Sequence, residues 1–154
     1  MKVLTTGTWA LKNYYSCSLP SQLLLKKVKF QDYYKAQNKN RTLDWQYQYG
    51  YVNMVTLFTS QKYLLKVSVA QASILFQYDE INQDVMTLGM LQDLTELSHN
   101  ELKAALFHLC KPKVRLLVKQ AKGPNFDDLT ELIKLNPRFT NAAKRIVLLP
   151  QMVS

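Results

Sequence analysis

The sequence predicts an α+β fold, in which a mixed α/β sheet subdomain is followed by a winged-helix domain. Residues 41–67 contain three short segments rich in β-branched and aromatic residues, which is typical of a meander of strands. Residues 68–78 are apolar and predict a helix directly after the meander. Residues 87–135 then follow the order helix, tight turn, helix and two strands, which indicates a winged helix.

The predicted strands of the meander lie at residues 41–49, 54–58 and 63–67. In the first of them, large side chains alternate with Asp and Gln at Leu43, Trp45, Tyr47 and Tyr49. One face of this strand is therefore apolar, and we expect Trp45 to be buried against Ile74 or Leu75. Stacking of nucleic-acid bases on the aromatic side chains is the alternative, but the intervening Asp and Gln favour packing.

Further elements are predicted before and after the meander. Residues 2–9 have the composition of a short strand, and Ser21 is expected to cap a helix that continues to about Ala36. Residues 79–84 are polar and predict a linker. The predicted domains are therefore residues 1–84, the α/β subdomain, and residues 85–154, the winged helix.

The predicted winged helix has clear start and stop signals. Thr87 is a candidate N-cap for its first helix, and Ser98 with Glu101 predicts a capping box for the next. The second helix has one apolar face, made by Leu102, Ala105, Leu106 and Leu109. Strands at residues 114–119 and 131–135 would form the wing.

Composition and motifs exclude several classes of function. The 154 residues are 47% apolar, which is ordinary for a folded domain, and they contain no apolar run long enough for a membrane span. Cys17 and Cys110 are far apart, which favours reduced thiols in the cytoplasm or nucleus. His99 and His108 lack metal-site spacing, and no phosphate-binding or nucleophile motif occurs. We expect no catalytic residue, cofactor or metal.

The formal net charge of +9 has two interpretations, a solvated basic surface or a patch for an acidic partner. The densest basic block consists of Lys26, Lys27, Lys29, Lys35, Lys39 and Arg41. A second group lies in the predicted winged helix and includes Lys111, Lys113, Arg115, Lys119 and Lys122.

Six motifs resemble those of the cullin homology domain. Two are the most specific: Arg41-Thr-Leu-Asp-Trp45 is similar to G-R-x-L-x-W, with Asn40 in place of Gly, and residues 71–79 match Q-x-x-I-L-x-x-[YF]-[ND] at every specified position. The others are weaker and occur in the family's order: residues 3–9 with Ala10 in place of proline, Leu19-Pro20, Phe30 to Tyr34, and the run from Asn136 to Ile146. The resemblance covers nearly the whole chain. Residues 19–21, 45–48 and 76–79 look nearest to the cullins that act with F-box adaptors.

The resemblance implies a non-catalytic scaffold of a RING ubiquitin ligase, which supports ubiquitin transfer to substrates for proteasomal degradation. In the family, a RING-box protein adds a strand to the sheet of the α/β subdomain and recruits a ubiquitin-conjugating enzyme, and other cullin-ligase regulators also bind. The residues expected to bind the partner are Val3, Leu4, Thr5, Leu43, Trp45, Tyr47, Val55, Thr56, Leu57, Leu64 and Leu65. Which strand forms the binding edge stays open. The basic block is expected to attract acidic segments of the conjugating enzyme.

Two further expectations accompany the resemblance. Members of the family begin with helical repeats and end with a second winged helix, which carries the modifier-accepting lysine. The chain is therefore expected to be a fragment or a shortened relative, and none of its lysines is assigned that role.

The alternative function is a winged-helix nucleic-acid binder that uses Lys103, Lys111, Lys113 and Lys119. Its predicted recognition helix, residues 101–109, carries only one basic residue, which argues against groove reading.

Overall fold

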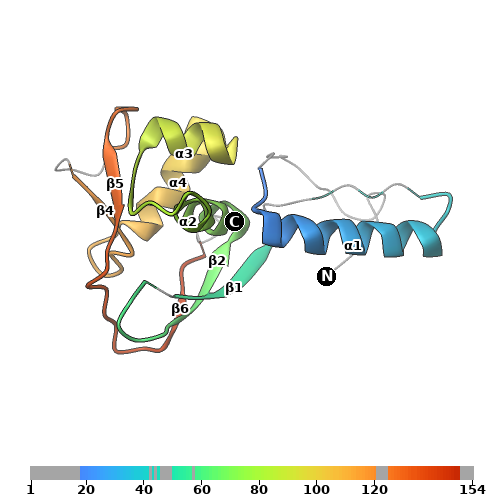
Figure 1. Cartoon of the computed structure of the whole chain (residues 1–154), viewed down its shortest axis with the longest axis horizontal. Coiled ribbons are helices and arrows are strands. Elements are labelled where there is room, and N and C mark those ends of the chain that lie inside the picture. The colour runs from blue at the N-terminus through green and yellow to red at the C-terminus, as the bar shows by residue number, and fades with distance from the viewer. Residues whose placement is uncertain are drawn as a thin grey trace, which may run out of the picture.

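The computed structural model describes residues 18–41, 43, 45, 50–56, 58–120 and 125–149. These residues form an α+β fold, as the sequence predicts (Figure 1). The elements in chain order are α1 (Ser21–Gln37), β1 (Tyr51–Val55), β2 (Leu64–Ser68), α2 (Val69–Ile81), β3 (Val85–Thr87), α3 (Leu88–Thr95), α4 (His99–Leu109), β4 (Leu117–Lys119), β5 (Leu132–Leu135) and β6 (Arg145–Val147). The strand predicted at residues 2–9 lies outside the described residues. No helix within the described ranges is long and apolar enough to cross a lipid bilayer.

The strands of the described residues form two three-stranded sheets. In the first, β2 is central, pairing antiparallel with β1 and parallel with β6. In the second, β5 is central, and both β3 and β4 pair with it antiparallel. The C-terminal strand β6 therefore returns to the first sheet, after the second sheet has been completed.

Helix α2 forms the centre of the core. It is buried on nearly every side, which is typical of a helix surrounded by other elements. It contacts β1 and β2 on one side and α3 and α4 on the other. The Tyr78 hydroxyl donates a hydrogen bond to the Ile133 carbonyl in β5 at 2.9 Å, and Gln71 Nε2 donates to the Leu148 carbonyl at 2.7 Å. Helix α2 thus joins both sheets through buried hydrogen bonds as well as apolar packing.

Local capping explains where three helices begin. Thr87 caps α3, and Ser98 with Glu101 forms a complete capping box at α4, both as predicted. Ser68 and Gln71 form a further capping box at α2, which was not predicted from the sequence. In each case the hydroxyl accepts a hydrogen bond from a backbone N–H that the first helical turn leaves without an intrahelical partner.

The N-terminus of α1 differs from the prediction, because Ser21 is the first helical residue and makes no capping bond within its own helix. Instead, the Ser21 N–H and hydroxyl both donate to Oε1 of Glu80, at 3.0 and 3.1 Å. A carboxylate from α2 therefore satisfies the N-terminus of α1. The expectation that residues 79–84 form a linker is wrong for Asp79, Glu80 and Ile81, which belong to α2.

Two strand boundaries also differ. The strand predicted at 54–58 lies at Tyr51–Val55, because the Thr56 hydroxyl accepts from the Tyr63 N–H at 3.0 Å and ends the pairing. The strand predicted at 114–119 is shortened to Leu117–Lys119, because Val114 N–H and Arg115 N–H both donate to the Lys111 carbonyl and form a turn. Arg115 has a left-handed φ of 51°.

The elements from α2 to β5 follow the order expected of a winged helix. The winged-helix assignment and the division at residue 84 stay predictions that this order supports. Helix α1, blue in Figure 1, extends away from the two sheets and from the other helices, and it has no buried residue among its 17.

Candidate partner-binding surfaces

Strand β1 forms one edge of the first sheet. The Thr56 N–H donates to the Tyr63 carbonyl at 3.0 Å, just beyond the paired residues of β1 and β2. Backbone groups alternate in direction along an antiparallel ladder, so those of Tyr51, Asn53 and Val55 point away from β2. In the described part of the chain, no strand pairs with this side of β1.

Strand β6 forms the opposite edge, and it is shorter. Leu64 N–H donates to the Lys144 carbonyl at 2.8 Å, which fixes the register of the parallel pairing. The backbone groups of Arg145 and Val147 consequently point away from β2. The first sheet thus has a five-residue edge and a three-residue edge.

The predicted partner-binding residues fall into different environments. Val3, Leu4, Thr5, Tyr47 and Leu57 lie outside the described residues. Val55 is exposed on β1 and Leu64 is exposed on β2, whereas Thr56 and Leu65 are buried. The assignment of these residues to a partner stays a prediction, but the side chains of Thr56 and Leu65 contribute to the folded interior.

The expectation that Trp45 is buried against Ile74 or Leu75 is wrong. Trp45 is half-buried and does not pack against the core cluster. Its ring contacts Phe30 of α1 edge-on, with 5.9 Å between centroids, and Lys27 Nζ lies 5.4 Å from the ring centroid. Its buried Nε1 has no hydrogen-bond partner among the described residues. Leu43 and Trp45 lie in no strand, and the remaining large residues of the alternating segment, Tyr47 and Tyr49, lie outside the described residues.

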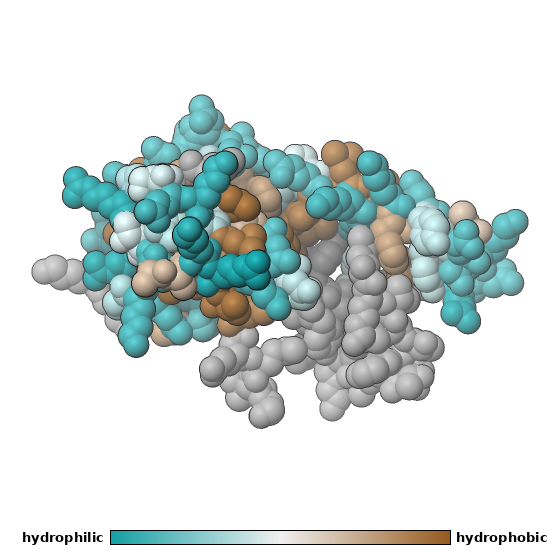
Figure 2. All heavy atoms as spheres, turned by 90° about the horizontal axis from the view of Figure 1, so that it is seen from below, coloured by the Kyte–Doolittle hydropathy of each residue, from teal (hydrophilic) through white to brown (hydrophobic). Residues whose placement is uncertain are grey.

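The predicted basic block lies along α1 and just beyond it. All of its members except the half-buried Lys27 are exposed. Lys26 and Lys35 are about two and a half helical turns apart, so they project from opposite sides of α1. Figure 2 shows hydrophilic and hydrophobic residues interleaved along this projecting helix. The block therefore makes the whole helix basic and does not converge on one binding face.

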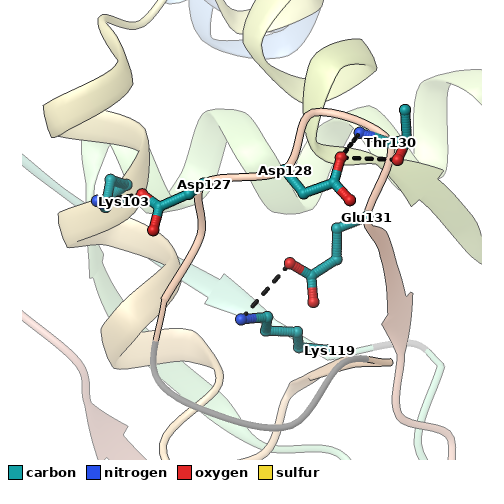
Figure 3. A network of polar contacts seen from close by, with 6 residues as sticks. All are labelled: Lys103, Lys119, Asp127, Asp128, Thr130 and Glu131. Carbon is teal, nitrogen blue, oxygen red and sulfur yellow. Dashed lines mark hydrogen bonds and ion pairs between the residues drawn. The ribbon is translucent and has the colours of Figure 1, made fainter.

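The lysines of the nucleic-acid alternative are placed differently. Lys103 Nζ lies 2.9 Å from Asp127 Oδ1, and Lys119 Nζ lies 3.5 Å from Glu131 Oε2 (Figure 3). Both carboxylates belong to the segment before β5, which these ion pairs connect to α4 and β4. Two of the four lysines are thus engaged in ion pairs beside the second sheet, whereas Lys111 and Lys113 lie in the turn after α4.

The titratable groups near this sheet show the effects of burial. Burial raises the pKa of the Cys110 thiol to about 12; the Lys119 cation opposes this rise and Glu131 adds to it. Burial also raises the pKa of Tyr78 and lowers the pKa of His108. The hydrogen bond from Lys103 lowers the pKa of Asp127. Within the described ranges, no group of His, Cys, Asp and Glu is arranged to hold a metal ion.

One surface feature of the folded chain was not predicted from the sequence. An open groove of about 900 Å³ lies between the end of α4, the turn at 111–115, β4 and residues 136–140. The second basic group was visible in the sequence, but Arg138 joins it only through the folding of residues 136–140 beside Arg115. No local pattern indicated that contact.

Comparison with known proteins identifies the chain's relatives. The family model described as the cullin alpha+beta domain matches residues 3–139. Cullin-3A of Arabidopsis thaliana is 31% identical over 144 residues, which are 92% of this chain and 19% of that protein. Cullin-3 of Dictyostelium discoideum is 33% identical over 118 residues, 77% of this chain and 15% of that protein. Cullin-4A of Mus musculus is 26% identical over 146 residues, 95% of this chain and 19% of that protein.

The chain spans about a fifth or less of the length of these curated relatives. They carry different cullin numbers, so the expected closeness to the F-box type stays a prediction. The family model nevertheless covers most of the chain and crosses both predicted domains. The chain belongs to the cullin family.

Proposed function

We propose that this chain is part of the non-catalytic scaffold of a cullin-RING ubiquitin ligase and binds the RING-box subunit by strand addition to its first sheet. The observation that carries the proposal is the edge strand β1, whose outer side pairs with no strand of the described residues, in a chain of the cullin family. Unpaired backbone groups at an edge are a template for a strand from another protein. Catalysis would then belong to the bound partners.

Strand β1 is the preferred edge, because it offers more backbone groups than β6. An added strand would pair with the outward groups of Tyr51, Asn53 and Val55. The side chains of Tyr51 and Val55 are 56% and 47% exposed, so they would add apolar contacts beside the backbone hydrogen bonds. Lys66 Nζ lies 4.2 Å from the centroid of the Tyr51 ring and holds a positive charge close to this edge.

The test is a proline substitution that removes one outward donor. Asn53→Pro removes an N–H directed away from β2 and leaves the pairing of β1 with β2 in place. Val147→Pro removes the outward N–H of Val147 at the β6 edge and is the matched control. Thr56→Pro is unsuitable, because the Thr56 N–H and hydroxyl both bond Tyr63 within the fold.

Co-expression with a RING-box protein and titration of the purified complex would measure the effect. We expect Asn53→Pro to weaken binding by about tenfold or more, with Val147→Pro close to wild type. The reverse pattern would assign the site to β6. Recovery of no RING-box protein by the folded wild-type chain would contradict the proposal.

The proposal extends to the other expected partners. The RING-box subunit would recruit a ubiquitin-conjugating enzyme, the basic block on α1 would attract its acidic segments, and other cullin-ligase regulators would bind the assembled scaffold in the cytoplasm, the nucleus or both. If the block acts by long-range attraction, its effect on association rate should fall steeply with added salt. The nucleic-acid alternative is not favoured, because Lys103 and Lys119 are engaged in ion pairs.

A further inference from the structure

Helix α1 meets the core of the fold at its N-terminal end (Figure 1). Just before the helix, the Ser18 N–H donates to the Thr95 carbonyl of α3 at 2.8 Å, and Pro20 is buried. Within α1, Leu23 packs partly against the core cluster, and no helix or strand of the described residues has extensive contact with α1. In the described part of the chain, the direction of α1 is therefore set largely by contacts around its first turn.

The carboxylate of Glu80, in the last turn of α2, makes the main polar contact at this end. Its Oε1 accepts hydrogen bonds from the Ser21 N–H at 3.0 Å and from the Ser21 hydroxyl at 3.1 Å. The first turn of α1 contains no acidic residue, so Glu80 supplies the negative charge that the N-terminus of a helix attracts. Ser21 and Glu80 are both exposed, so the contact between the two helices can change without opening the core.

A phosphoryl group on Ser21 would reverse the sign of this contact. Phosphoserine carries a charge of about −1.5 to −2 at neutral pH and lacks the hydroxyl donor. Beside Glu80, two hydrogen bonds to a carboxylate would be replaced by repulsion between two anions. At the first residue of α1, the same phosphoryl group would accept hydrogen bonds from the N–H groups of the first turn. The modification would therefore separate α1 from α2 and leave α1 helical.

We propose that Ser21 is a phosphorylation site and that its contact with Glu80 is a latch, which the modification opens. In a protein kinase, Ser21 Oγ attacks the γ-phosphorus of ATP, the bond from this phosphorus to the oxygen of the departing ADP breaks, and the hydroxyl proton passes to a base of the kinase. With the latch open, α1 pivots about Ser18 and Pro20, which stay attached to the core. The basic block then points in directions that the closed latch prevents. The inference does not depend on strand addition to the first sheet.

NMR relaxation of the backbone amides tests the latch, because it reports whether α1 moves together with the core. The unmodified whole chain is compared with the same chain carrying phosphoserine in place of Ser21, incorporated during expression. In the unmodified chain, we expect order parameters of about 0.85 for both α1 and α2. After modification, the order parameters of α1 should fall below about 0.6, whereas those of α2 should not change. The Cα chemical shifts of α1 should stay helical.

Glu80→Lys reverses the charge of the other partner and provides the control. Alone, it places a cation at the N-terminus of α1 and should release α1 as phosphorylation does. Combined with phosphoserine at residue 21, it restores opposite charges, and the order parameters of α1 should return to about 0.85.

Three results would overturn the proposal. Order parameters of α1 that do not change on phosphorylation would show that the contact with Glu80 does not hold the helix. Release of α1 by phosphorylation in the Glu80→Lys chain as well would show that repulsion from Glu80 is not the cause. Loss of the helical chemical shifts would show that the modification unfolds α1 and does not release it as a helix.

Discussion

Replacing Lys119 by methionine removes the cation from a buried ion pair. The Lys119 and Glu131 side chains are only 9% and 6% exposed, and Lys119 Nζ also lies 4.7 Å from the centroid of the Phe126 ring. At their separation of 3.5 Å, the attraction is about 5 kcal/mol for an effective dielectric constant of about 20. Much of this is offset in the wild type by the cost of removing both charges from water.

In the variant, Glu131 is still removed from water, but the attraction of Lys119 no longer offsets the free-energy cost of burying its charge. We therefore expect Lys119→Met to lower the free energy of unfolding by about 3–5 kcal/mol. Exchanging both residues, Lys119→Met with Glu131→Leu, should restore most of that loss because no buried charge is left. The measurement is urea denaturation followed by circular dichroism, with equal m-values as the sign of a shared two-state transition.

The ion pair between Lys103 and Asp127 provides the control. It is shorter, at 2.9 Å, but its side chains are 37% and 65% exposed. Water screens such a pair, so Lys103→Met should leave the midpoint of unfolding almost unchanged. A loss of less than about 1 kcal/mol for Lys119→Met, or an equal loss for Lys103→Met, would contradict the role assigned to burial.

Three other predictions concern single side chains. The pKa of Cys110 rises from about 9 to about 12 on folding, because the buried thiol resists ionisation. The protonated thiol therefore stabilises the fold fully below pH 9, and this stabilisation is lost as the pH rises toward 12. Above pH 9 the unfolding free energy should fall less steeply in Cys110→Ala than in wild type, by up to about 1.4 kcal/mol per pH unit. Ser98→Ala should cost about 1 kcal/mol in urea melts through loss of the capping box, and an unchanged midpoint would contradict this. Trp45→Ala should lower the free energy of unfolding by much less than the loss of about 3–5 kcal/mol that is typical of a buried aromatic residue. A loss in that range would indicate that Trp45 packs in the core.

Local signals in the sequence identified much of the fold correctly. Thr87 and Ser98 mark helix starts in structure as they do in sequence, because an N-cap depends only on residues within one turn. The apolar run at 68–78 likewise becomes α2. These elements need no information from distant parts of the chain.

The features that escaped prediction depend on distant contacts. Strand β6 has three residues and is stabilised by pairing with β2, far away in the chain. The N-terminus of α1 is satisfied by Glu80 of α2, and Trp45 packs on α1 although its alternation indicated a sheet face. The groove exists because Asn136 brings Arg138 beside Arg115. Secondary-structure propensities and the spacing of apolar residues carry no information about such contacts.

The groove and the first sheet share one buried aromatic pair. Phe139, on the floor of the groove, packs edge-on against Tyr63, with ring centroids 5.0 Å apart. Tyr63 lies directly before β2 and bonds Thr56 at the end of β1, and its hydroxyl accepts from the Asn141 N–H at 3.1 Å. Truncating Phe139 would therefore disturb the groove and the first sheet together. Lys113 and Arg138 line the groove but are exposed, so substituting them should leave the first sheet and RING-box binding unchanged, whereas truncating Phe139 should weaken both.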